Sequence, residues 1–201
     1  MLFEIIFQRS GAIIVDIHNI LKIIGGVGTV LLFIPMAIQT VKENGAGQSF
    51  ATWILWAALD TILAISTIMK DGNYLLPLGF SIGGVAMTVL LLLKRRFAWE
   101  KLDNLVLGLV VVCLVVWYLT GARTAIIAST LATSLASIPG LIELWQRPQR
   151  RVANLWGWFA ITNAVSFFGG TAMSIEEKFT PAIFTVLSLM MFIAGRRNLN
   201  R

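Results

Sequence analysis

Residues 50–69, FATWILWAALDTILAISTIM, decide the class of fold, because this apolar run contains a single charged residue, Asp60. A helix of about 20 apolar residues is long enough to cross the hydrocarbon core of a bilayer. Similar runs occupy most of the chain, so hydropathy predicts a bundle of membrane-spanning helices. The seven expected spans are residues 20–39, 50–69, 74–93, 104–120, 122–142, 153–172 and 180–195.

The composition points the same way. Hydrophobic residues make up 57% of the 201 residues and charged residues 13%, whereas soluble domains are ~45–50% apolar and ~25% charged. A soluble chain of this length could not bury so much apolar surface. The composition therefore excludes a soluble globular enzyme, a disordered chain and a disulfide scaffold. It predicts an all-α integral membrane protein whose surroundings are the lipid bilayer.

The segment 1–19 is ambiguous, because Glu4, Arg9, Asp16 and His18 interrupt its apolar residues. It is consistent either with an interfacial helix or with an extension of the first span. It does not resemble a cleaved signal peptide, since it lacks a basic start and a small-residue cleavage site.

The basic residues are unequally divided between the two sides of the expected bundle. Connectors 40–49, 94–103 and 143–152 and the C-terminal tail carry 11 of the 16 Lys and Arg residues, and the other side carries 5. The positive-inside rule then places the N-terminus outside and the C-terminus in the cytoplasm. We interpret the basic clusters as topology signals and lipid-headgroup contacts, so no nucleic-acid partner is expected.

Cys113 and His18 are the only cysteine and the only histidine. A disulfide, a multi-histidine metal centre and a bis-histidine haem are therefore excluded, and no glycine-rich nucleotide loop is present. We predict no metal and no cofactor. We also predict no enzyme, because one carboxylate at mid-span is too little for an intramembrane catalyst.

Prolines at repeated spacing indicate an internal repeat. The separation between Pro35 and Pro77 equals that between Pro139 and Pro181, and the two pairs share one offset in the sequence. Three spans, one span and three further spans would give corresponding helices the same direction, which defines a parallel repeat. We therefore expect two three-helix bundles joined by a linker helix, with the boundaries 20–96, 97–121 and 122–197.

The end of the first expected span reads IPMAIQ at 34–39, and Lys42 and GAGQS at 45–49 follow it. This segment resembles the PQ-loop pattern, which consists of a proline, a basic loop with glycine and a serine at the start of the next helix. Pro139 with the following arginines resembles a second copy, although neither proline is followed by glutamine. The whole arrangement is similar to the SWEET and PQ-loop transporter superfamily and to the vitamin-precursor transporters that share its fold. The resemblance implies a secondary transporter.

Asp60 is the candidate site residue with the clearest physical argument. A charged Asp at mid-span costs roughly 2.5–3.5 kcal/mol, so such groups usually face a cavity or a partner. Trp53, Trp56 and Asp60 share one helix face at i, i+3 and i+7. The carboxyl either binds solute, couples protons or makes a packing contact between helices.

A matching face occurs in the second half, where Trp156, Phe159 and Asn163 stand at the same relative spacing. Aromatic rings stack on solutes and polar tips donate and accept hydrogen bonds. The predicted substrate-binding residues are Asp60, Asn163, Trp56, Phe159, Trp53 and Trp156. An interfacial aromatic belt is the alternative reading of Trp53 and Trp156.

Four further residues have candidate roles in conformational change. Pro35 and Pro139 interrupt helical hydrogen bonding, and they act either as paired hinges or as static kinks. Gln39 and Glu143 occupy matching positions beyond these prolines, and they form either a cytoplasmic gate or solvated helix ends.

These features predict a secondary transporter or facilitator that moves a small polar solute, sugar-like or another metabolite, by alternating access. The alternative is a non-transporting receptor, sensor or accessory subunit of similar fold. The sequence leaves open the identity of the solute, proton coupling and a homo-oligomeric state.

Overall fold

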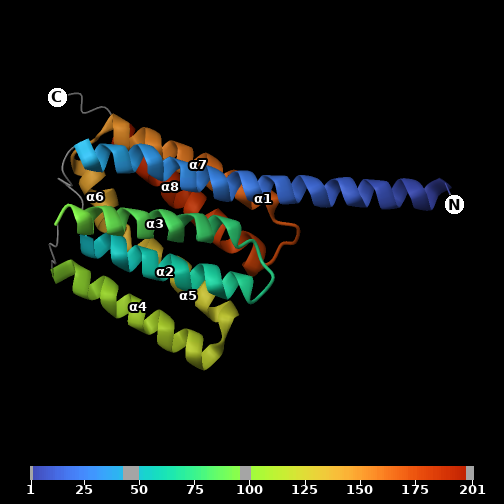
Figure 1. Cartoon of the computed structure of the whole chain (residues 1–201), viewed down its shortest axis with the longest axis horizontal. Helices are drawn as coiled ribbons and strands as arrows, with labels where there is room; N and C mark the ends of the chain where they lie inside the picture. The colour runs from blue at the N-terminus through green and yellow to red at the C-terminus, as the bar shows by residue number, and fades with distance from the viewer. Residues whose placement is uncertain (1, 43–49, 96–100, 198–201) are drawn as a thin grey trace.

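The computed structural model describes residues 2–42, 50–95 and 101–197, and loop residues 45–49 of the PQ-loop resemblance lie outside these ranges. The described chain is all-α, as expected. Its elements, shown in Figure 1, are α1 (Leu2–Lys42), α2 (Phe50–Ile68), α3 (Leu75–Leu93), α4 (Lys101–Thr120), α5 (Ala122–Ala136), α6 (Ile138–Gln146), α7 (Arg150–Gly169), the π-helix η1 (Ile175–Phe179) and α8 (Thr180–Arg196).

Five helical stretches are long and apolar enough to cross a membrane. They are Asp16–Lys42, Phe50–Ile68, Leu75–Leu93, Ala122–Gln146 and Ile175–Arg196. The chain is thus an all-α protein with the helices of a multi-pass membrane protein. Helix α4 covers the expected span 104–120, and α7 covers the expected span 153–172 as far as Gly169, but neither is among these five, so the count of seven stays a prediction.

Large apolar side chains cover the outside of the bundle, as expected of surfaces that face lipid tails rather than water. On α1 they follow one another along the whole length for which side chains are described. The most exposed, all at least half exposed, are Ile17, Ile20, Ile23, Ile24, Val27, Leu31, Ile34 and Ile38.

The ambiguity of segment 1–19 is resolved in favour of an extension of the first span. Helix α1 is continuous over 41 residues. With a rise of about 1.5 Å per residue it measures roughly 60 Å, about twice the ~30 Å hydrocarbon thickness. Its N-terminal part projects alone beyond the other helices in Figure 1.

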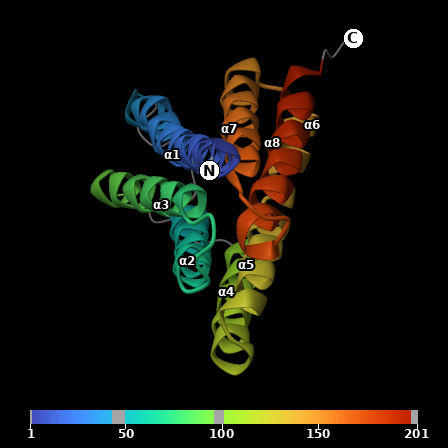
Figure 2. The same ribbon diagram turned by 90° about the vertical axis from the view of Figure 1, so that its right-hand side faces the viewer.

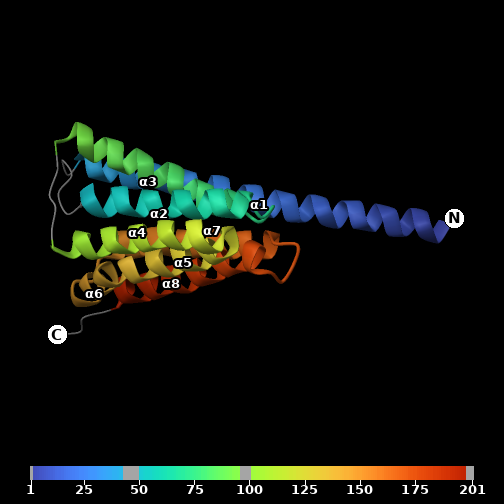
Figure 3. The same ribbon diagram turned by 90° about the horizontal axis from the view of Figure 1, so that it is seen from below.

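The helices form two groups that meet along two contacts. Helix α3 packs against both α1 and α2, while α8 packs against α7, α6 and α5. The groups then join where α1 packs on α7 and α2 packs on α5. Figures 2 and 3 show α1–α3 on one side of the molecule and α5–α8 on the other.

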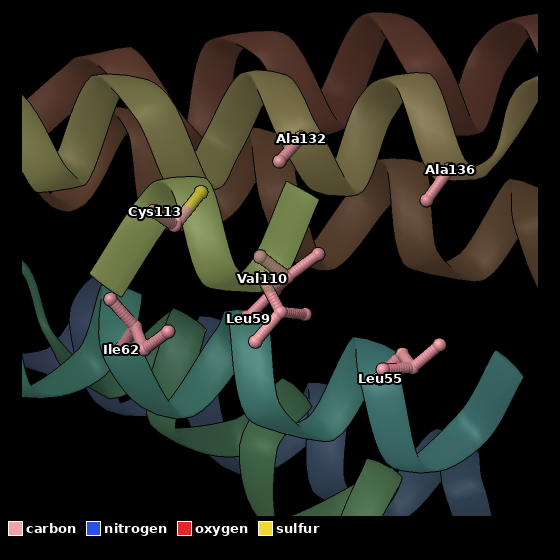
Figure 4. Packing of buried hydrophobic residues seen from close by; sticks show 7 residues of the cluster. All are labelled: Leu55, Leu59, Ile62, Val110, Cys113, Ala132 and Ala136. Carbon is pink, nitrogen blue, oxygen red and sulfur yellow. The ribbon is translucent and has the colours of Figure 1, made fainter. Parts of the chain in front are cut away.

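The long helix α4 packs beside both groups rather than within either one. It contacts α2 and α5, and Figure 4 shows a buried apolar cluster at this three-helix junction. Its members are Leu55, Leu59 and Ile62 from α2, Val110 and Cys113 from α4, and Ala132 and Ala136 from α5.

Small residues permit close helix contacts, as is usual in membranes. A Cβ atom added to Gly26 of α1 would lie 2.6 Å from the carbonyl oxygen of Leu75, at the start of α3. The same surface of α3 continues to Gly79, where an added Cβ would lie 2.7 Å from the carbonyl oxygen of Gly26. The α1–α3 contact thus depends on glycine at both helices.

Most of the basic residues lie at one end of the bundle. The C-terminal ends of α1, α3 and α8 lie there with the N-terminal ends of α2 and α7 (Figure 1). We call this the basic end, and the other end of the bundle the opposite end. The described basic residues at the basic end are Lys42, Lys94, Arg95, Lys101, Arg147, Arg150, Arg151, Arg196 and Arg197.

Candidate functional site

Asp60 is buried in the middle of α2, with 5% of its surface exposed. Its Oδ1 atom has no hydrogen-bond partner among the described residues, and no described basic side chain forms an ion pair with it. The neighbouring Thr61 hydroxyl pairs instead with the Ser81 hydroxyl of α3, at 2.7 Å. Buried polar atoms are normally hydrogen-bonded, so a buried carboxyl oxygen without a described partner is unusual.

The two predicted aromatic faces meet in the interior through Phe33 of α1. The ring of Phe33 lies 6.0 Å from that of Trp53 and 5.5 Å from that of Phe159, centroid to centroid. Trp56 is 5.5 Å from Trp53, and Trp156 is 5.7 Å from Phe159. All four predicted aromatic residues therefore belong to one cluster, within which Trp53 is buried.

Asn163 lies one helical turn beyond Phe159, as Asp60 lies one turn beyond Trp56. It is completely buried, and its Nδ2 atom donates to the Ser188 hydroxyl of α8 at 3.1 Å. Its Oδ1 atom has no partner in the described chain. Since α2 and α7 both start at the basic end, the two polar residues are displaced from the aromatic cluster in the same direction.

Helix α5 adds polar groups that the sequence reading missed. Helices α2 and α5 run in opposite directions, and Leu63 packs with Ile126 and Phe184 in one cluster. A helical rise of about 1.5 Å per residue, counted from that contact, places Asp60 near the level of Ser129. Thr133 Oγ1 and Trp56 Nε1 are buried without a described hydrogen-bond partner, whereas the Ser129 hydroxyl has the Cys113 thiol of α4 as a partner.

By helical spacing, Trp56 and Asp60 share the face of α2 that carries Leu63, and Ser129 and Thr133 share the face of α5 that carries Ile126, so we call these groups the polar strip of the α2–α5 contact. It contains acceptors, such as the Asp60 carboxyl, and donors, such as the Trp56 indole N–H. Donors and acceptors that lack protein partners are the groups needed to bind a polar solute.

Phe80 and Phe184 are the second omission of the sequence reading. Phe80 of α3 stacks on Phe159 at 5.5 Å, and it meets Phe184 of α8 edge to face at 5.3 Å. Phe184 follows Phe80 at the same offset that relates Pro181 to Pro77. Extending the proline alignment by one further helical turn would have found them.

The two proposed hinge prolines differ in their surroundings. Pro35 lies inside the uninterrupted helix α1. Pro139 is the second residue of α6, which follows α5 after the single turn residue Ser137 within the helical stretch Ala122–Gln146. Hydrogen bonds of the helical kind continue through this point, because the Ser137 N–H donates to the Thr133 carbonyl at 3.1 Å and the Leu141 N–H to the Ser137 carbonyl at 3.0 Å.

The two proposed gate residues lie on different helices at the basic end. Glu143 is exposed on α6, a helix that packs against α8. Gln39 lies on α1 and lines a groove between α1 and α7 of about 430 Å³. The other lining residues are Leu32, Pro35, Arg151, Asn154, Leu155 and Trp158, so Asp60 and Asn163 lie elsewhere.

The opposite end of the bundle is covered by η1 and the turn before it. Lys22 of α1 forms an ion pair with Glu177, with 2.9 Å between Nζ and Oε2. Glu176 binds Arg123 of α5 at 3.0 Å, and its carbonyl oxygen accepts the Asn73 N–H at 3.1 Å. One short segment thus ties together α1, α5 and the α2–α3 turn.

Asn73 also has a side-chain role at this end. Its Nδ2 atom donates to the carbonyl oxygen of Ser166, at 2.8 Å, and to the Ser166 hydroxyl, at 3.0 Å. This contact joins the α2–α3 turn to α7. Across the described ranges, no group of three or more His, Cys, Asp or Glu residues could hold a metal ion.

No protein-family model matches this sequence, and no curated protein matches it. The function is therefore inferred from the chain's own residues. The strongest of them are a buried carboxyl and a buried amide, each with an unpaired oxygen within the described ranges, next to a cluster of aromatic rings.

Proposed function

We propose that this protein is a secondary transporter or facilitator of a small polar solute, which it moves across the membrane by alternating access. The observation that carries the proposal is the unpaired Oδ1 of Asp60, buried one turn from the aromatic cluster. A buried carboxyl in a membrane protein is costly, and such residues commonly mark a substrate or ion pathway.

The arrangement of helices supports two parallel three-helix halves, at 20–96 and 122–197, with α4 as the linker. In each half the third helix lies between the other two, because α3 contacts α1 and α2 while α8 contacts α5, α6 and α7. The contacts between the halves also correspond, since α1 packs on α7 and α5 packs on α2. An axis along the membrane normal, near the Phe80–Phe184 contact, would relate the halves.

The orientation in the membrane follows from the charges in this proposal. The basic end faces the cytoplasm, which puts the C-terminus inside and the N-terminus outside. The η1 segment then covers the outer end. The Lys22–Glu177 and Arg123–Glu176 pairs would hold that end closed in the state described here.

In the proposed mechanism the solute binds between the halves near mid-membrane. Asp60 and Asn163 supply hydrogen bonds, and Trp53, Trp56, Trp156 and Phe159 supply apolar planes. Rocking of one half against the other would break the contacts of η1 and open the outer end. Pro35 and Pro139 would absorb the bending of their helices.

The test is uptake into proteoliposomes of a mixed panel of polar metabolites, quantified by mass spectrometry. We expect wild-type protein to accumulate at least one solute, and Asp60→Asn to reduce that uptake at least about tenfold. The matched control is Asp71→Asn, which makes the same change on an exposed turn residue whose positive φ of 50° asparagine tolerates.

Two outcomes would overturn the proposal. One is wild-type uptake no greater than that of protein-free vesicles for every solute in the panel, which would favour a receptor, sensor or accessory subunit. The other is equal uptake by Asp60→Asn and Asp71→Asn, which would remove Asp60 from the site.

A further inference from the structure

The groove between α1 and α7 changes in polarity along its length. The part farther from the basic end, which we call the deep part, is lined by Leu32 and Trp158. The part at the basic end, which we call the shallow part, is lined by Gln39 and Arg151. On each helix about two turns, roughly 10 Å, separate the deep from the shallow member. Since α1 and α7 run in opposite directions, both helices become polar toward the same end.

The shallow part carries positive charge that no described side chain neutralises. Arg151 is exposed, and no hydrogen bond or ion pair of its side chain occurs within the described residues. A second guanidinium lies at the rim, because Arg196 donates to Asn154 Oδ1 at 3.0 Å. No acidic side chain of the described ranges lines the groove.

The deep part is apolar and open at the side. Trp158 of α7 is 57% exposed, although it is a large aromatic residue. Leu155 and Leu32 are partly buried beside it. An apolar slot of this kind accommodates a hydrocarbon chain.

We propose that this groove binds one anionic phospholipid from the leaflet at the basic end. The headgroup phosphate pairs with Arg151, near Arg196, and an acyl chain lies along Leu32, Leu155 and Trp158. Arginine favours phosphate because its planar guanidinium donates two parallel hydrogen bonds. Basic pockets between membrane helices at the cytoplasmic side recognise lipid headgroups in this way.

The position of Pro35 gives the bound lipid a structural consequence. Pro35 lines the groove between its deep and shallow parts, and its ring leaves the preceding turn of α1 without one backbone hydrogen bond. A lipid in the groove braces α1 against α7 at the turn that lacks this hydrogen bond. This binding does not depend on the proposed transport activity.

The test uses native mass spectrometry of the purified full chain, with phosphatidylglycerol and phosphatidylcholine of identical acyl chains as probes. We expect the first bound phosphatidylglycerol to be retained at least about tenfold better than phosphatidylcholine. Arg151→Gln should abolish this preference, and Arg151→Lys should keep part of it. Arg147→Gln is the matched control, because Arg147 follows α6 at the same end but does not line the groove.

A second variant tests the chain-binding part without altering charge. Leu155→Trp should fill the slot and weaken phosphatidylglycerol binding while Arg151 stays in place. Equal losses in Arg151→Gln and Arg147→Gln would overturn the proposal, because they would indicate a diffuse attraction to the whole basic end. Wild-type protein that does not distinguish the two lipids would overturn it as well.

Discussion

Lys22 Nζ lies 2.9 Å from Glu177 Oε2, and this ion pair joins α1 to the η1 segment across 155 residues of sequence. Both side chains are largely buried, with 15% and 9% of their surfaces exposed. The Thr171 backbone N–H donates to the same Glu177 oxygen at 3.3 Å. The cover over the opposite end therefore depends on a charge pair that is shielded from solvent.

Lys22→Met should destabilise the protein, because it leaves the Glu177 carboxylate buried without its cation. We expect a loss of roughly 2–3 kcal/mol, below the ~3–5 kcal/mol of a fully buried pair, measured as a lower Tm in detergent. Arg123→Gln is the control. It breaks a pair whose arginine side chain is 60% exposed, so its effect should stay within about 1 kcal/mol. Equal effects would mean that the two pairs hold the end equally.

Trp56→Phe should separate solute binding from stability. The indole Nε1 of Trp56 is buried without a described hydrogen-bond partner, so its removal costs no described hydrogen bond and should leave Tm unchanged or slightly raised. If that N–H binds solute, the half-saturation concentration for uptake should rise by about tenfold. Trp117→Phe, on α4 beside the Leu55 cluster, should leave uptake unchanged. Equal uptake kinetics in the two variants would contradict the assignment of Trp56.

Phe80 and Phe184 should be energetically coupled, because their rings meet edge to face at 5.3 Å. A double-mutant cycle with Phe80→Leu and Phe184→Leu, read by detergent unfolding, should give a coupling of about 1 kcal/mol. The control cycle pairs Phe80 with Phe168, which is 64% exposed at the end of α7, and should give none. A coupling near zero in the first cycle would show that the contact contributes no specific stability.

Gly26→Ala should loosen the contact between α1 and α3. The new Cβ would lie 2.6 Å from the backbone oxygen of Leu75. A backbone atom cannot relieve this clash by rotating, as a side chain can. Overpacking of this kind typically costs about 1–3 kcal/mol, so Tm should fall. Gly108→Ala on α4 meets nothing within 4 Å and should be neutral or slightly stabilising through helix propensity. A neutral Gly26→Ala would mean that the helices can separate without cost.

Pro35→Ala distinguishes a hinge from a static kink. Alanine restores the backbone N–H inside the continuous helix α1, so the variant should have a higher Tm. If bending at Pro35 is part of transport, uptake should become slower while Tm rises. Pro148→Ala, between α6 and α7, should change neither. Unchanged uptake by Pro35→Ala would favour the static kink.

Much of the architecture could be predicted from local patterns. The apolar runs predicted an all-α chain, and five of them are helices able to cross a membrane. The placement of Asp60 within one such helix was also predictable, because a lone carboxylate in an apolar run is conspicuous. The aromatic residues that share its face could be named from helical spacing alone.

Other features depended on contacts that no local pattern contains. The proline pattern predicted paired hinges, and only the structure showed that Pro35 lies inside the uninterrupted helix α1 whereas Pro139 lies two residues after the turn residue Ser137. Asn73 lies in the turn before α3, and its side chain binds Ser166 on α7. That contact joins residues 93 positions apart, so no local pattern in the sequence could predict it.

By itself the sequence determined that the chain is helical, belongs in a membrane and carries one isolated carboxyl in an apolar helix. These features depend only on the hydropathy of each residue and on helical spacing within one segment. Only the tertiary structure decided that Phe80 meets Phe184, that Lys22 meets Glu177 and that Asp60 has an oxygen without a described partner. These relationships join residues from separate helices. They depend on how closely those helices pack, a property of all the side chains at each contact and not of any one segment.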